Sequence, residues 1–216
     1  RAGARRKRNA MEKFIKPRLL TPSGQSHKKF WQAVGLCALT AAIFFLPFYL
    51  LDGGFFHYAG DFNSQQISFY RYMNGFVKGA GYPDSAFAGA PRNTFSWATD
   101  LGSGVMNAYS FYLYGSPFFW LSVLLPQSWL PYMMVPLLVL KFGVAGGGAY
   151  LYLRRYVKNA NYAVLGACLY ALSGFAVYNV FFNHFVDVVA LFPYLLWALD
   201  EAIYEDRHGL FAFWVA

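Results

Sequence analysis

Long apolar runs alternate with short polar segments along most of this chain. The run 30–51 carries no charge and has the roughly 20-residue length that crosses a bilayer. Runs of the same kind cover 131–153, 162–182 and 188–203, and another begins at 209. This pattern predicts an all-α, polytopic integral membrane protein whose helices pack as one bundle.

A long polar and glycine-rich segment separates the first apolar run from the second. It covers residues 52–130, and we expect it to lie outside the hydrocarbon core as one large loop. Within it, 64–78 has helical spacing, and the residues that share an apolar face are Ile67, Tyr70, Met73 and Val77. This spacing predicts a helix that lies along the membrane surface.

Composition and charge placement support a membrane class and set an orientation. The chain has 216 residues, of which 57% are hydrophobic and 13% are charged, which is too few charges to cover a soluble globule. Ten of the 18 Lys and Arg lie in residues 1–29, beside an apolar run. We therefore interpret 1–29 as a cytoplasmic tail that contacts anionic lipid, and not as a nucleic-acid-binding segment. The loop 52–130 is then extracytoplasmic.

The segment 109–126 leaves two topologies open, because Gly115 and Pro117 interrupt its apolar run. If it crosses the membrane, Arg154 and Arg155 lie outside, against the positive-inside rule. If it is a re-entrant or surface helix, they lie inside, and the turn 183–187 lies outside with Asp61. We favour the second topology. The chain ends inside an apolar run, so we also expect it to be the N-terminal part of a longer protein.

Three places in the predicted external loop could carry chemistry. Asp61, in Gly-Asp-Phe-Asn, could be a general base, a metal ligand or a turn residue. Asp100 opens a glycine-rich segment that lacks the lysine of a nucleotide-binding loop, although its backbone amides could contact a substrate phosphate. Arg92 is a second candidate for binding that phosphate.

Charged residues within the apolar runs form a second group of candidates. His184 and Asp187 lie three residues apart in a predicted polar turn, a spacing that fits half of a metal site or a hydrogen-bonded turn. Convergence with Asp61 or Asp100 would favour a divalent metal. Lys141 lies near the middle of its apolar run, where it could be a phosphate counter-ion or the partner of an internal ion pair.

We assign structural roles to the glycine triad, the two cysteines and the acidic pair near the end of the chain. Gly146-Gly147-Gly148 predicts close packing between helices. Cys37 and Cys168 lie in apolar runs without a CxxC spacing, and we interpret them as buried small residues. Asp200 and Glu201 are expected to be ordinary interfacial charges.

One stretch of sequence resembles a known family. The basic tail, one apolar run, Gly-Asp-Phe-Asn-Ser-Gln-Gln at 60–66, Phe-Ser-Trp at 95–97 and the aromatic segment 109–120 resemble the start of the YfhO family of bacterial membrane proteins. That family in turn resembles the C-type glycosyltransferases, which use polyprenyl-linked sugars. The resemblance implies a helical bundle of C-type with juxtamembrane helices in the first external loop.

The resemblance also implies a reaction. C-type enzymes place an acidic residue in the first external loop, a position that Asp61 matches, and often another in the next external turn, which Asp187 matches. Neither place has an acid-x-acid pair, so metal dependence is left open. The implied activity is inverting transfer of a sugar from a polyprenyl-phosphate carrier to an envelope polymer such as lipoteichoic acid. The base would be Asp61, and Arg92 or Lys141 would contact the phosphate.

Two other functions fit the same sequence. A transporter or flippase of a lipid-linked precursor would use Lys141, His184 and Asp187 along its pathway. A non-catalytic membrane assembly factor would need none of these residues for chemistry. Loss of activity on Asp61→Asn without loss of folding would argue against the assembly factor.

Overall fold

The computed structural model describes most of the chain. The described residues are 26–58, 60–79, 95–97, 99 and 101–216. Residues 1–25 of the predicted basic tail, Arg92 and Asp100 lie outside them, while 26–29 of that tail form the start of a helix. The described part is helical except for one antiparallel pair of two-residue strands, β1 (Phe95–Ser96) and β2 (Ser103–Gly104). The predicted all-helical class is therefore confirmed.

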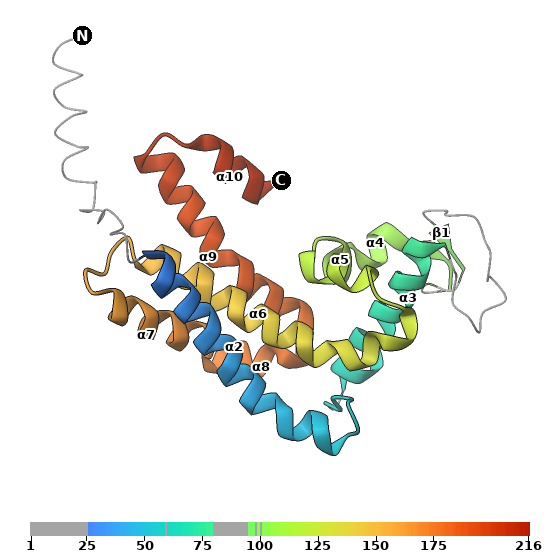
Figure 1. Ribbon diagram of the computed structural model, residues 1–216. Helices are drawn as coiled ribbons and strands as arrows, with labels where there is room; N and C mark the ends of the chain where they lie inside the picture. The colour runs from blue at the N-terminus through green and yellow to red at the C-terminus, as the bar shows by residue number, and fades with distance from the viewer. Residues whose placement is uncertain (1–25, 59, 80–94, 98, 100) are drawn as a thin grey trace, which may run out of the picture.

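Four helices form the bundle, with α6 packed against each of the other three. They are α2 (Ser26–Leu51), α6 (Leu130–Leu153), α7 (Ala160–Ala171) and α9 (Asn183–Tyr204). Figure 1 shows α2 and α7 running antiparallel to α6, while α9 runs parallel to it. Within the described residues, three helical stretches are long and apolar enough to cross a membrane: His27–Leu51, Gln127–Leu153 and Ala160–Tyr204.

The outer face of α2 fits a lipid environment. Large apolar side chains along this helix are exposed, including those of Leu39, Ile43, Phe44 and Leu50. An exposed apolar strip of this length would aggregate in water, whereas lipid tails solvate it at no cost.

Glycines allow α2 and α9 to approach α6 closely. A Cβ added to Gly146 would lie 2.4 Å from Cys37 Sγ, and one added to Gly148 would lie 2.5 Å from the ring of Tyr194. The Tyr194 hydroxyl donates a hydrogen bond of 3.1 Å to the carbonyl of Val144. The predicted packing role of the glycine triad is confirmed.

The third apolar stretch differs from the predicted runs 162–182 and 188–203. After α7, Ser173 begins a short helix, α8 (Gly174–Tyr178), by accepting a hydrogen bond of 3.3 Å from the amide of Ala176. A 3-10 turn, η4 (Asn179–Phe182), follows. The predicted polar turn 183–187 is wrong, because these residues are the first turns of α9.

The segment between α2 and α6 folds into a layer of short helices. In chain order they are η1 (Phe62–Ile67), α3 (Ser68–Lys78), α4 (Val105–Tyr109), η2 (Ser110–Tyr114), α5 (Pro117–Val123) and η3 (Gln127–Trp129), where η1 and η2 are π-helices. The predicted apolar face of α3 turns inward: Tyr70 and Met73 are buried. Asn74 Nδ2 ties α3 to α5 by donating to the carbonyl of Ser122 at 2.9 Å.

This layer lies at one end of the bundle. The chain enters it from the end of α2 and leaves it into α6 at the same end (Figure 1). α5 has seven residues, too few to cross a bilayer. Among the described residues, 109–126 is not one of the stretches long and apolar enough to cross, which agrees with the topology that we favour.

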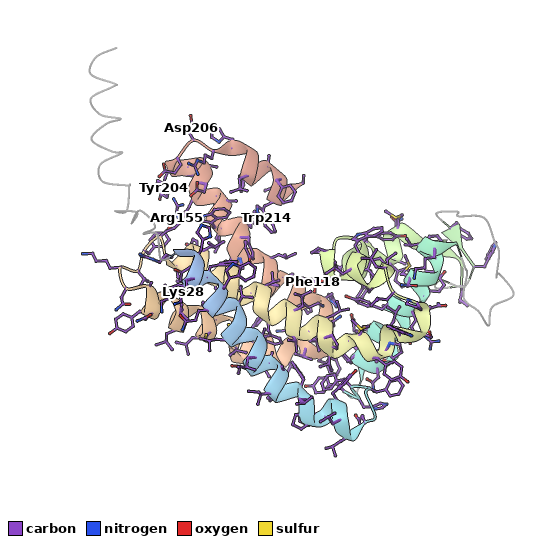
Figure 2. All side chains as sticks on the ribbon, viewed as in Figure 1. Lys28, Phe118, Arg155, Tyr204, Asp206 and Trp214 are labelled. Atoms are coloured by element: carbon purple, nitrogen blue, oxygen red, sulfur yellow. The ribbon has the colours of Figure 1, made fainter. Side chains whose placement is uncertain are left out.

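The opposite end of the bundle carries a buried ionic network. Arg155 pairs with Asp200 at 3.5 Å and with Glu201, and Glu201 also pairs with Arg207 at 3.2 Å. The prediction that Asp200 and Glu201 are ordinary interfacial charges is wrong, since both are buried. Figure 2 shows Lys28, Arg155 and Tyr204 together at this end and Phe118 toward the other.

The last helix, α10 (His208–Val215), folds back on α9. The ring of Trp214 stacks on that of Tyr194, with 5.2 Å between centroids and an interplanar angle of 15°. The C-terminal end of α10 therefore lies on the side of α9 that faces the layer of short helices (Figure 1).

Candidate functional site: a buried polar cluster beside an apolar cavity

The centre of the candidate site is Lys141, whose side chain is 0% exposed in the middle of α6. Its Nζ lies 2.6 Å from Asp187 Oδ1. It also donates to the side-chain oxygen of Asn183 at 2.7 Å and to the carbonyl of Asn183 at 3.1 Å. Of the two roles that the sequence left open for Lys141, the structure has the internal ion pair.

The first turns of α9 supply both partners of Lys141. Helical spacing from Asn183 to Asp187 places the two side chains on the same face, toward α6. The aromatic ring of Phe118 lies 5.5 Å from Lys141 Nζ and adds a cation–π contact. A charge buried this deeply is tolerated because it has both an anion and hydrogen-bond acceptors.

His184 joins the cluster to the layer of short helices. Its Nδ1 lies 3.3 Å from Nε2 of Gln66, a residue of η1 whose side chain is completely buried. Rings of Phe111, Tyr112 and Phe185 surround the imidazole at centroid distances of 4.8, 4.7 and 4.6 Å. The imidazole is thereby held in one place by η1, η2 and α9.

Tyr70 of α3 completes the buried side of the cluster. Burial raises the pKa of its hydroxyl above the ordinary value, and the negative charge of Asp187 raises it further. The hydroxyl therefore stays protonated at neutral pH. Among the described residues the hydroxyl has no hydrogen-bond partner with good geometry. The side chains of Ser116 and Asn183 lie near it and partly offset the rise in its pKa.

A cavity of about 340 Å3 lies next to the cluster, between α9, the 111–116 segment and α10. Most of its wall is apolar, and the apolar side chains are those of Phe111, Val188, Leu191, Phe192, Leu195 and Trp214. Ser116, His184 and Asp187 supply its polar groups. The cavity is thus a mainly apolar space with three polar side chains grouped near the layer of short helices.

Asp61 occupies a different place from the cavity wall. It precedes η1, and its Oδ1 accepts a hydrogen bond of 3.1 Å from Gln65 Nε2. The preceding Gly60 has a φ of +79°, and a Cβ there would lie 2.5 Å from the ring of Phe181 in η4. Glycine at position 60 therefore lets the Asp61 turn pack directly against the segment that leads into α9.

The described residues do not gather a metal site. Among them, no group of three or more His, Cys, Asp and Glu side chains is arranged to hold a metal ion. The predicted half-site is divided, because Asp187 pairs with Lys141 and His184 contacts Gln66. Arg92 and Asp100 lie outside the described residues.

Sequence reasoning missed four polar members of the cluster: Gln66, Tyr70, Ser116 and Asn183. A hint for Gln66 was present in the sequence, because this uncharged polar residue lies next to Ile67 in the apolar pattern of 64–78. In the structure its side chain is buried. Asn183 was predicted to lie in a turn, which hid its helical spacing to Asp187. Ser116 carries a second role, because it caps α5 by accepting a hydrogen bond of 3.2 Å from the amide of Phe119.

Comparison with known proteins gives one match. The family model for bacterial membrane protein YfhO matches residues 34–216, which is most of the chain. Neither a curated protein nor a solved structure matches.

Proposed function

This chain belongs to the YfhO family of bacterial membrane proteins, and from that premise we propose that it is a membrane glycosyltransferase. It would move a sugar from a polyprenyl-phosphate carrier to a cell-envelope polymer resembling lipoteichoic acid, on the extracytoplasmic face. The observation that carries this proposal is the cavity of about 340 Å3 with an apolar wall and a polar end.

The shape of the cavity suits an amphipathic donor. Leu191, Phe192 and Leu195 offer an apolar surface to a prenyl chain, which gains free energy by leaving the solvent. Ser116, His184 and Asp187 lie where the sugar phosphate of such a lipid would follow. Ligand sites commonly combine an apolar wall with a few polar groups that orient the ligand.

The proposed reaction is a single displacement. The acceptor hydroxyl oxygen attacks the anomeric carbon, the bond from that carbon to the phosphate oxygen breaks, and polyprenyl phosphate leaves with the electron pair. A carboxylate accepts the hydroxyl proton, and the anomeric configuration inverts. No nucleotide is consumed. A divalent metal is left open, and Arg92 is the remaining candidate for the leaving phosphate.

Two carboxylates are candidates for the base. We propose Asp61 first, because the family resemblance assigns the role to its position and because its turn packs against the segment leading into α9. Asp187 is the second, because it borders the cavity. Gln66 connects the two regions through its contact with His184.

The test is sugar transfer in membranes. Protein in native membranes receives a radiolabelled polyprenyl-phosphate sugar and envelope polymer, and wild type is compared with Asp61→Asn and Asp187→Asn. Wild-type labelling of the polymer and its loss in folded Asp61→Asn would support both the reaction and the base. Equal labelling by wild type and Asp61→Asn would remove Asp61 from the chemistry and move the base to Asp187. No labelling by wild type would sink the transferase.

One observation favours a second function. The ion pair between Lys141 and Asp187 lies inside the bundle, where ionisable pairs also occur along transport pathways. A flippase of a lipid-linked precursor would move a fluorescent polyprenyl-phosphate analogue between leaflets of proteoliposomes without transferring its sugar. That measurement separates the two functions directly.

A further inference from the structure

We propose that Lys141 is a positioning residue for Asp187 and does not contact the donor phosphate. This inference rests on the proposed function, since it assigns roles within the same site. It concerns three groups: the Lys141 ammonium, the Asp187 carboxylate and the backbone and side chain of Asn183.

Oxygen atoms of Asn183 and Asp187 surround the Lys141 ammonium. An ammonium group has three N–H donors. Its Nζ has three oxygen neighbours, namely Asp187 Oδ1 at 2.6 Å, Asn183 Oδ1 at 2.7 Å and the Asn183 carbonyl at 3.1 Å. The side chain is 0% exposed and is not part of the cavity wall. A ligand in the cavity therefore meets the side chains of Asp187 and His184, and not that of Lys141.

Asp187 is held between its partner and the cavity. It pairs with Lys141 on the α6 side and borders the cavity on the other side. The other titratable groups close to it are His184, one helical turn earlier, and Tyr70 from α3. A lone carboxylate beside an apolar wall would take up a proton, because burying an unpaired charge is costly. The Lys141 ammonium supplies the opposite charge that offsets this cost.

An ionised Asp187 at the polar end of the cavity can accept a hydrogen bond or a proton from a sugar hydroxyl. A protonated Asp187 could accept no proton. Lys141 thus acts on the chemistry of the cavity through Asp187, whose carboxylate it pairs with and directs. Asn183 contributes by fixing the ammonium between α6 and α9.

Carbodiimide labelling tests this role without any sugar transfer. Dicyclohexylcarbodiimide modifies protonated carboxyl groups in apolar surroundings, and mass spectrometry locates the adduct. We expect Asp187 to be unmodified in wild type, modified in Lys141→Met, and the adduct to be absent from that peptide in Lys141→Met/Asp187→Asn. Modification of wild type to the same extent as Lys141→Met would overturn the proposal.

Kinetics in the same membranes give the second test. We expect Lys141→Met and Asp187→Asn each to lower kcat by about 100-fold or more, with the donor KM unchanged and the double variant no worse than either single variant. An increase in donor KM confined to Lys141→Met would overturn the proposal in favour of a phosphate counter-ion.

A third outcome would identify the pair as a structural link between two helices. In that case the folded double variant Lys141→Met/Asp187→Leu, which replaces the ion pair by apolar side chains, would transfer sugar at the wild-type rate. That result would overturn the positioning role. Absence of transfer by wild type would instead overturn the proposed function, and the carbodiimide result would then decide the role of Lys141.

Discussion

Gly146 is a residue at which α6 packs tightly against α2. An added Cβ would lie 2.4 Å from Cys37 Sγ, 2.9 Å from Cys37 Cβ and 3.1 Å from the Ala33 carbonyl oxygen. We predict that Gly146→Ala lowers the free energy of unfolding by about 1–3 kcal/mol, because the two helices must separate. Thermal unfolding in detergent measures the change.

Gly35→Ala is the matched control for that prediction. It places the same methyl group on α2 with no atom within 4 Å. Alanine has the better helix propensity, so we expect the melting temperature to stay equal or to rise slightly. Equal melting temperatures for Gly146→Ala and Gly35→Ala would show that the α2–α6 contact is looser than described.

Asn74 is the residue that joins α3 to the end of α5. Its Nδ2 donates to the carbonyls of Ser122 at 2.9 Å and Leu125 at 3.3 Å, and the side chain is fully buried. We predict that Asn74→Ala destabilises the protein by about 1–3 kcal/mol, because two buried hydrogen bonds of the amide and its packing between α3 and α5 are lost. Asn107→Ala, at an exposed position in α4, should change stability by less than about 0.5 kcal/mol. An equal effect of the two variants would contradict this account.

The contacts of individual residues were the part of the structure that the sequence predicted least. The sequence identified Lys141 as unusual from the cost of charge inside an apolar run, and it identified Asp187 from its place near a helix end. It did not pair them, because the two lie 46 residues apart and the pairing depends on the register between α6 and α9. The hydrogen-bonding roles of Gln66 and Ser116 depend on the same tertiary contacts.

At the scale of elements, an aromatic stack contributes to the packing of α10 against α9. Trp214 lies flat on Tyr194, whereas its neighbour Phe213 is 73% exposed. We predict that Trp214→Ala increases amide hydrogen exchange across His208–Val215 and leaves α9 unchanged, since aromatic pairs contribute about 0.5–1.5 kcal/mol beyond buried area.

Phe213→Ala is the control for the stacking prediction. It removes an aromatic ring from the same helical turn. The stack between Tyr194 and Trp214 is retained. Exchange in α10 should then match wild type. If Phe213→Ala has the larger effect, contacts other than the stack hold α10 in place.

Elements with a strong apolar pattern were predicted well, and broken ones were not. The runs 30–51 and 131–153 fall within α2 and α6, because uninterrupted apolar sequence leaves a helix as the one way to satisfy the backbone in lipid. The run 162–182 contains Ser173-Gly174, and the serine side chain caps a new helix there. Asn183 and Asp187 favour turns in isolation, yet Lys141 binds both and the helix continues through them.

At the scale of the whole molecule, the positions of the two ends predict the orientation in the membrane. We expect the layer of short helices to be extracytoplasmic and the Arg155 end to be cytoplasmic. In a variant with Cys37→Ala and Cys168→Ala, a membrane-impermeant maleimide should label Asn107→Cys in intact cells. Lys158→Cys should react with the maleimide only after the cells are permeabilised.

The reverse labelling pattern would invert the proposed orientation, and labelling of both positions in intact cells would contradict the membrane-spanning bundle. Glu205→Cys serves as a second cytoplasmic position, because it is exposed at the end of α9. The sidedness stays a prediction, based on the charges of Arg154, Arg155 and Arg207. The cavity could not be predicted from the sequence, because its wall combines α9, the 111–116 segment and α10, which are joined by tertiary packing alone.

Two of the short helices near the site, η1 and η2, have π-helical turns, each of which accommodates one residue more than an α-helical turn. In an α-helix each residue advances by about 100° around the axis, so tightening η1 to α-helix would rotate everything before it by about that angle. Gln66 would stay with His184, while Asp61 would turn to another side. The additional residue in η1 therefore sets the direction of Asp61 relative to the cavity.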